Sequence, residues 1–289
     1  MKPKPEPELH RCELIRVLAA ALARIDPGAS EWLTLREENF RLVSWTSLLY
    51  SEPRDLALDL PGIERLLVEP DASARDRLEI DTWQRRLRRL GHLFGDSFPV
   101  LWPWLASADL RATLDTVVAY LDNADGTSDR IRGLLIEQLE SAWSAGERIL
   151  LIGHSLGSVI AYDCLWQLSR RADRRGRVEL LMTLGSPLAT RFIRKGLLGA
   201  AHSGPDRFPD NIDRWVNVSA RGDLVALHPR LKPFFSEMLR HRLIESIEDQ
   251  AGIYNHFRSP EGLNPHKSYG YLNHAAVSGR ICRWLGNAP

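Results

Sequence analysis

The chain of 289 residues has few cysteines and almost no net charge. Its three cysteines, Cys12, Cys164 and Cys282, are odd in number and widely spaced, which excludes the disulfide framework of small secreted domains. We expect Cys164 to be buried as a small hydrophobic side chain. Lysine and arginine total 38 against 37 acidic residues, giving a formal charge of +1, so no overall field favours nucleic acid as a partner.

Long apolar runs are also absent. The first eight residues are rich in proline and charge and lack the apolar core of a secretory signal. No window reaches the ~20 apolar residues that a membrane-spanning helix requires. These absences predict a cytoplasmic protein without a membrane span. No repeat or low-complexity tract interrupts the chain, no pattern implies a cofactor or a metal, and the oligomeric state is left open.

What the sequence does contain is an alternation of apolar strands and amphipathic helices. At 44% hydrophobic residues, 1–289 can bury one large core, so we predict a single α/β domain in which 52–105 is a helical insertion or cap. Such alternation favours a mostly parallel central sheet with helices on both faces. The expected strands are 40–45, 148–152, 178–184 and 215–218, and the expected helices are 9–25, 80–94, 110–121, 131–143, 156–168 and a last one ending near Trp284.

The most informative motif is Gly153-His154-Ser155-Leu156-Gly157, which joins an apolar strand to a helix. This is the G-x-S-x-G pattern of a nucleophile elbow, a sharp strand-to-helix turn that exposes a reactive serine. We expect Gly153 and Gly157 to be required because side chains there would collide with neighbouring backbone, and Ala161 to keep the helix close to the sheet. The motif predicts Ser155 as a catalytic nucleophile.

A nucleophilic serine needs a general base, and the base needs a carboxylate that sets its tautomer. In this architecture the chain order is serine, acid, histidine. Asp223 is the best acid, because it follows a buried strand directly in the turn Arg221-Gly222-Asp223. Other aspartates precede that strand and are expected at the opposite edge of the sheet; they are Asp206, Asp210 and Asp213.

Five histidines follow Asp223, and we rank them by the segment that carries them. His266 lies in a loop before the last helix, where a base would be delivered, and is our first choice. His274, expected one to two turns inside that helix, ranks second, and His256 ranks third. The remaining two are His228, which is close to Asp223 in sequence, and His241, which lies in a basic helical stretch.

Taken together, these motifs resemble the α/β-hydrolase superfamily, nearest to its serine esterase and lipase branch. The resemblance extends from Trp45 to the C-terminus and rests on Gly153–Ser158, on Gly185-Ser186-Pro187-Leu188, and on Pro265-His266 with Gly270-Tyr271-Leu272. It implies Ser155, Asp223 and His266 as nucleophile, acid and base, with the Leu156 backbone N–H as one donor of the oxyanion hole.

One feature of such hydrolases is absent. Relatives usually open with a buried strand ending in His-Gly, whose following loop supplies a second oxyanion donor, and no such pair occurs near this N-terminus. The nearest local candidate is Trp45-Thr46-Ser47. Losing one donor typically lowers the rate by about a hundredfold or more.

The expected reaction is hydrolysis of carboxylic esters through an acyl-enzyme on Ser155, with lipids and thioesters as open alternatives. A second hypothesis, motivated by the missing His-Gly strand, is a weakly active or inactive domain that serves as a binding or scaffold module. An acyl pocket or lid is one interpretation of the bulky segments 98–105, 205–209 and 233–235, and core packing is the other. The arginines at 85–89 could contact anionic lipid headgroups or form a solvated helix face.

Overall fold

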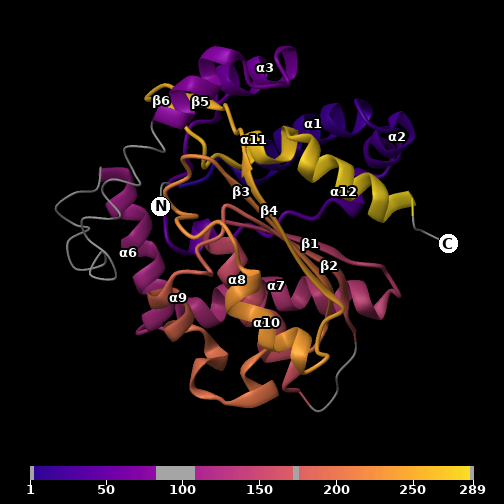
Figure 1. The fold of residues 1–289 in the computed structure, drawn as a ribbon, viewed down its shortest axis with the longest axis vertical. Helices are drawn as coiled ribbons and strands as arrows, with labels where there is room; N and C mark the ends of the chain where they lie inside the picture. Colours follow the sequence, from indigo (N-terminus) through magenta and orange to yellow (C-terminus); the bar gives the residue numbers. More distant parts are fainter. Residues whose placement is uncertain (1–2, 83–107, 172–175, 287–289) are drawn as a thin grey trace. The chain divides into compact units, whose positions relative to one another are not determined.

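The computed structural model describes residues 3–82, 108–171 and 176–286 (Figure 1). A four-stranded sheet has the order β1 (Leu150–His154), β2 (Val178–Leu184), β3 (Ile212–Ala220), β4 (Ser246–Ile253). The β1–β2 and β2–β3 pairs are parallel, with Leu150 opposite Leu180 and Leu184 opposite Val218. The protein is therefore α/β with a small, parallel sheet, as the alternating pattern predicted.

The chain divides into two compact units, each built from separate stretches of sequence. Unit 1 contains 1–2, 91–219 and 225–251, and unit 2 contains 3–90, 220–224 and 252–289. The expected insertion at 52–105 contributes η3 (Leu56–Leu58), α3 (Leu60–Val68) and a helical stretch at 74–82 to unit 2, whereas 83–107 lie outside the described residues.

Unit 1 has its core where helices pack on the parallel strands. Helix α8 (Leu156–Ser169) packs against β1 and against α7 (Thr127–Ser144). The side chains of Leu181 and Trp215, opposite each other on β2 and β3, are fully buried, with the Trp215 ring 5.8 Å from that of Tyr162 on α8, and Cys164 is buried as expected. The other helical elements of this unit are α6 (Ala108–Asp122), α9 (Arg191–Gly196), η5 (Leu198–Ala201), η6 (Gly204–Arg207) and α10 (Lys232–Arg240).

Unit 2 is mainly helical and is organised around its first helix. Helix α1 (Pro7–Ala23) buries an apolar stripe against α2 (Pro27–Leu35), α3, α11 (Ser268–Asn273) and α12 (Ala275–Gly286). The Asp26 carboxylate accepts from the Gly28 and Ala29 backbone N–H groups, so it caps α2 where the sequence indicated only a helix stop. The remaining elements are η1 (Glu37–Asn39), η2 (Thr46–Leu48) and the antiparallel pair β5 (Arg258–Ser259) and β6 (Gly262–Leu263).

Most predicted elements are confirmed, but the strand at 40–45 is wrong. That segment has no regular structure, and all six of its side chains are partly or fully exposed. The Phe40 carbonyl accepts from Arg11 Nε at 2.9 Å, so a side chain occupies a backbone group that a strand would pair. Alternation of apolar and polar residues does not make this segment a strand, because it has no buried face and no strand partner in the part of the chain that the structure describes. The predicted helices at 110–121, 131–143 and 156–168 and the strands at 178–184 and 215–218 all lie within observed elements.

Candidate active site

Ser155 forms the turn between β1 and α8 and has a strained backbone. Its φ of 55° and ψ of −129° are rare for a residue with a side chain, and its N–H donates to the Leu184 carbonyl at 3.0 Å. The turn thus has the geometry that the G-x-S-x-G motif predicted. Leu156 begins α8, so its N–H lies in the first helical turn, where no intrahelical acceptor exists and negative charge is stabilised.

The two motif glycines are not equivalent. A Cβ on Gly153 would lie 2.7 Å from Ser158 Cα and 2.9 Å from the Gly157 carbonyl oxygen, so only glycine fits without a backbone shift. A Cβ on Gly157 would meet no atom within 4 Å. The expectation that Gly157 avoids a collision is therefore wrong, because its Cα faces open space.

A chain of hydrogen bonds between serine hydroxyls holds the backbone of the turn at Ser155. Ser158 Oγ donates to the Ser155 carbonyl at 2.6 Å and lies 2.7 Å from Ser186 Oγ, which accepts from the Leu188 N–H at 3.2 Å. Since Ser158 has only one hydroxyl proton, Ser186 must donate to Ser158. The Gly185–Leu188 motif, whose role the sequence left unassigned, thus fixes the carbonyl of the candidate nucleophile.

Asp223 and His266 are brought together within unit 2. Asp223 follows β3 in a tight turn in which Gly222 has a φ of 76°, and its side chain is buried. His266 Nδ1 lies 2.9 Å from Asp223 Oδ2, which confirms that these two residues, 43 positions apart, form a pair. An ionised carboxylate only accepts hydrogen bonds, so we assign the proton to Nδ1, which leaves Nε2 as the basic nitrogen.

Sequence reasoning missed the role of Tyr271. Its hydroxyl donates to Asp223 Oδ2 at 2.6 Å and accepts from the Ala220 N–H at 2.9 Å. Burial, together with the negative charge of Asp223, raises the pKa of Tyr271, so the phenol stays protonated and remains a donor. Tyr271 lies in the Gly270-Tyr271-Leu272 motif, which was the only signal available for it.

The loop that carries His266 is held at several points. Asn264 Oδ1 accepts from the His266 N–H at 3.2 Å, and the fully buried Asn255 donates through Nδ2 to the Lys267 carbonyl at 2.8 Å. Lys267 Nζ in turn pairs with the buried Asp59 carboxylate at 2.7 Å, and burial lowers the pKa of Lys267 to about 8. These contacts fix the backbone on both sides of His266.

The competing histidines have other partners. His256 Nε2 lies 2.9 Å from the Glu69 carbonyl oxygen, so this nitrogen donates and is engaged. His274 is not inside the last helix as predicted; it separates α11 from α12, and its Nδ1 accepts from the Ala276 N–H at 3.0 Å. The helix breaks there because His274 caps the first turn of α12.

The competing aspartates contact arginines in unit 1, Asp206 and Asp213 through their carboxylates and Asp210 through its backbone carbonyl. Asp206 accepts from Arg170 Nη1 at 2.8 Å, and Asp213 pairs with Arg177, whose Nη1 also donates to the Asp210 carbonyl at 2.5 Å.

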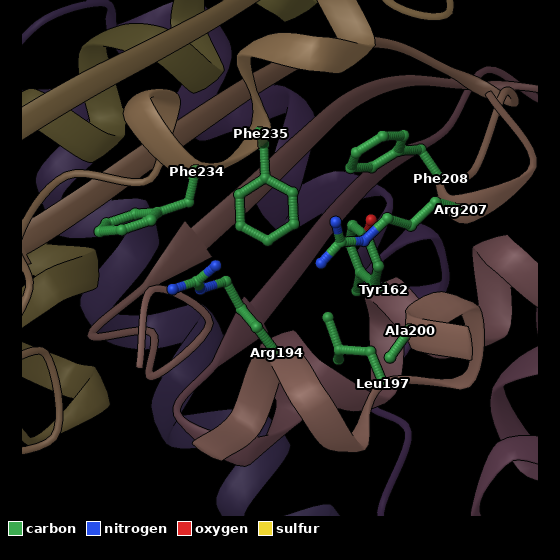
Figure 2. A pocket seen from close by; sticks show the side chains of 8 residues that line it. All are labelled: Tyr162, Arg194, Leu197, Ala200, Arg207, Phe208, Phe234 and Phe235. Atoms are coloured by element: carbon green, nitrogen blue, oxygen red, sulfur yellow. The ribbon is translucent and has the colours of Figure 1, made fainter. Parts of the chain in front are cut away.

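The remaining predicted features are the candidate for a second oxyanion donor, the bulky segments and the arginine cluster. Thr46 begins η2, which follows Trp45, in unit 2. Segment 98–105 and the arginines at 85–89 lie outside the described residues. Phe208, Phe234 and Phe235, from the other two bulky segments, line a pocket within unit 1 (Figure 2). Across the described ranges, no cluster of His, Cys, Asp and Glu could hold a metal ion, and no helix is long and apolar enough to cross a bilayer.

Comparison with known proteins leaves the family open. No protein-family model and no solved structure matches the chain. A 90-residue segment is 31% identical to a transmembrane and coiled-coil domain-containing protein from rice (Oryza sativa subsp. japonica). The matched segment is 31% of this chain and 13% of the rice protein, so the likeness covers a small part of that relative.

Proposed function

We propose that the protein is a serine hydrolase that cleaves carboxylic esters through an acyl-enzyme on Ser155. The observation that carries the proposal is the strained backbone of Ser155 at the sharp turn between β1 and α8. Such strain is uncommon in ordinary connections and clusters at functional sites. The Asp223–His266 pair supports it independently, because it supplies an oriented base on a different part of the chain.

In the proposed reaction, Ser155 Oγ adds to the ester carbonyl carbon while His266 Nε2 takes the hydroxyl proton. The Leu156 N–H stabilises the developing oxyanion, and Asp223 stabilises the imidazolium that forms. His266 then returns the proton to the leaving alcohol, which leaves an acyl group on Ser155. Water, activated by the same histidine, hydrolyses the acyl-enzyme and restores the serine.

The proposal extends to the class of substrate only as far as carboxylic esters. Lipid and thioester substrates use the same chemistry, and a series of p-nitrophenyl esters from acetate to palmitate would rank the acyl chains. We also propose Trp45-Thr46-Ser47 as the source of the second oxyanion donor; the last two of these residues begin η2, where the first N–H groups have no acceptor within the helix.

The test is labelling by a fluorophosphonate probe together with hydrolysis of p-nitrophenyl butyrate. We expect Ser155→Ala to lose all labelling and at least about 10³-fold in turnover, because the nucleophile is gone. Ser203→Ala, which removes an exposed hydroxyl elsewhere in unit 1, is the matched control and should behave as wild type. A folded wild-type protein that is neither labelled nor active would favour the scaffold hypothesis instead.

A further inference from the structure

A buried ion pair in unit 2 anchors the loop that carries His266. Lys267, the next residue in the chain, places its Nζ 2.7 Å from Asp59 Oδ2. The Asp59 side chain is completely buried, and that of Lys267 is 15% exposed. Burial lowers the pKa of Lys267 to about 8, so at pH 7 most of the amine still carries its proton and the pair is charged.

The Lys267 amine has aromatic neighbours as well as a carboxylate. Its Nζ lies 5.6 Å from the centre of the Phe257 ring and 5.5 Å from that of Tyr269, and both rings are fully buried. A cation near the face of an aromatic ring is attracted to it. The end of this long side chain is therefore held by a carboxylate and two rings at once.

Asp59 is itself a fixed point in the fold. Its N–H donates to the Leu56 carbonyl at 2.8 Å, and its carbonyl accepts from the Ile63 N–H at 3.0 Å. The second carboxylate oxygen, Oδ1, accepts from Arg54 Nη1 at 2.5 Å. Through this carboxylate, Lys267 is tied to the start of α3, 208 residues earlier in the chain.

The backbone of Lys267 connects this anchor to the histidine. Its N–H donates to the Asn264 carbonyl at 3.2 Å, and its carbonyl accepts from Asn255 Nδ2 at 2.8 Å. His266 is one peptide bond away, and its Nδ1 lies 2.9 Å from Asp223 Oδ2. A displacement of the loop by about 1 Å would lengthen that contact beyond the ~3.2 Å at which such hydrogen bonds are normally found.

Stability alone does not account for charges at this place. A buried ion pair adds little net stability, because both groups lose their hydration, and apolar side chains of similar volume often replace such a pair without loss. A charged hydrogen bond does depend strongly on distance and direction. The pair between Lys267 and Asp59 therefore specifies one position of the loop relative to α3.

We propose that Lys267 and Asp59 are positioning residues that hold His266 in the orientation in which it pairs with Asp223. The catalytic meaning of this role rests on the proposed hydrolase function, whereas the pairing itself can be measured whether or not the protein is a hydrolase. Neither residue takes part in the chemistry. Without the anchor, the imidazole would spend part of its time away from Asp223, so the rate of the chemical step falls while binding of the ester is little affected.

Lys267→Met is the first test, since it removes the charge at nearly the same length and leaves Asp59 paired with Arg54. We expect kcat for p-nitrophenyl butyrate to fall about 10- to 100-fold and KM to change by less than about threefold, because a misplacement of about 1 Å can lower a rate about 10²-fold. In NMR spectra, the proton on His266 Nδ1 is identified by its loss in His266→Ala. Its exchange with water should become at least about ten times faster in Lys267→Met, because the loop opens more often.

The same unit offers a matched control. Asp76 is also buried and also pairs with two cations, Arg65 at 2.9 Å and Arg258 at 2.8 Å. Arg65→Met therefore removes one cation from a buried carboxylate and leaves the other, as Lys267→Met does. It should lower the urea midpoint of unfolding but keep kcat and proton exchange within about threefold of wild type. Equal acceleration of exchange in both variants would show a general loosening of the unit and would overturn the proposal.

Asp59→Asn tests the anchor from its other end, and it keeps the proposal testable if Lys267→Met does not fold. It should lower kcat and speed proton exchange in the same way. The double variant should be no more than about threefold slower than the slower single variant, because loss of either end already releases the loop. Losses that multiply in the double variant would show that the two residues act separately.

The two measurements distinguish this role from the proposed function. A folded wild-type protein that hydrolyses no ester would contradict the hydrolase function, and exchange of the His266 proton would still decide the positioning role. Unchanged exchange in either folded variant, or absence of that proton signal from the wild type, would refute the positioning role even in an active hydrolase.

Discussion

Replacing Gly153 by alanine is the sharpest test of the turn that presents Ser155. The added Cβ would lie 2.7 Å from Ser158 Cα and 2.9 Å from both Ser158 N and the Gly157 oxygen. Carbon atoms in contact prefer about 3.5–4.0 Å, so the start of α8 would have to move by about 1 Å. The atoms that would have to move belong to the backbone, which cannot rotate away as a side chain can.

Overpacking of this kind typically costs about 1–3 kcal/mol. We therefore expect Gly153→Ala to lower the free energy of unfolding by that amount in urea titrations followed by circular dichroism. The shift would also disturb the hydrogen bond from the Ser155 N–H to Leu184, so fluorophosphonate labelling should slow together with the loss of stability.

Gly157→Ala is the matched control, since it makes the same substitution four residues later in the same motif. Its Cβ would enter open space, and alanine favours the helix over glycine by up to about 1 kcal/mol, so stability should be unchanged or higher. Equal destabilisation of both variants, or none in Gly153→Ala, would show that steric fit does not explain the motif.

Three further predictions concern charged and buried groups. Asp223→Asn should lower ester turnover by roughly 10⁴-fold, because the imidazole of His266 would then adopt the wrong tautomer. His266→Ala should abolish both turnover and fluorophosphonate labelling, whereas His274→Ala should keep both. Loss of activity in His274→Ala but not in His266→Ala would refute the assignment of His266 as the base. Tyr271→Phe should lower the free energy of unfolding by about 2–4 kcal/mol in urea titrations. The substitution removes the hydrogen bond to the Asp223 carboxylate and leaves the buried Ala220 N–H without its acceptor. Burial raises the pKa of Asp163 to about 6 from 3.8, so this carboxyl on its own lowers the free energy of unfolding by about 2–3 kcal/mol as pH rises from about 4 to 6, whereas His10, whose pKa burial lowers to about 3, acts in the opposite direction. The difference in free energy of unfolding between wild type and Asp163→Asn should therefore fall by about 2–3 kcal/mol between pH 4 and 6, and a difference that does not change with pH would contradict the reasoning.

Several parts of the fold could be predicted because local pattern and burial coincide in them. The strand Val178–Leu184 is nearly all apolar and is buried almost throughout, so its composition alone identifies it. Segment 40–45 alternates between apolar and polar residues, yet it has no neighbouring strand among the described residues. The sequence of a segment does not reveal whether a strand will pair with it.

The order of residues along the chain was enough to predict the acid and the histidine of the candidate site. Asp223 and His266 were identified from their places after a strand and before the last helix, and they do pair. The roles of Tyr271 and Asn255 depend on how α11 packs beside the turn at Gly222, and no spacing in the sequence specifies that. The break at His274 was missed because a histidine rarely signals a helix start, although its ring nitrogen can cap one.

The hydroxyl chain from Leu188 through Ser186 and Ser158 to the Ser155 carbonyl has a consequence for how this sequence can vary. Each serine supplies one proton, so the chain runs in one direction only. Losing one hydroxyl alone leaves a buried polar group without its partner, whereas exchanging both for small apolar side chains removes the mismatch. Positions 158 and 186 should therefore change together in relatives of this protein, as a covarying pair that links two motifs 28 residues apart.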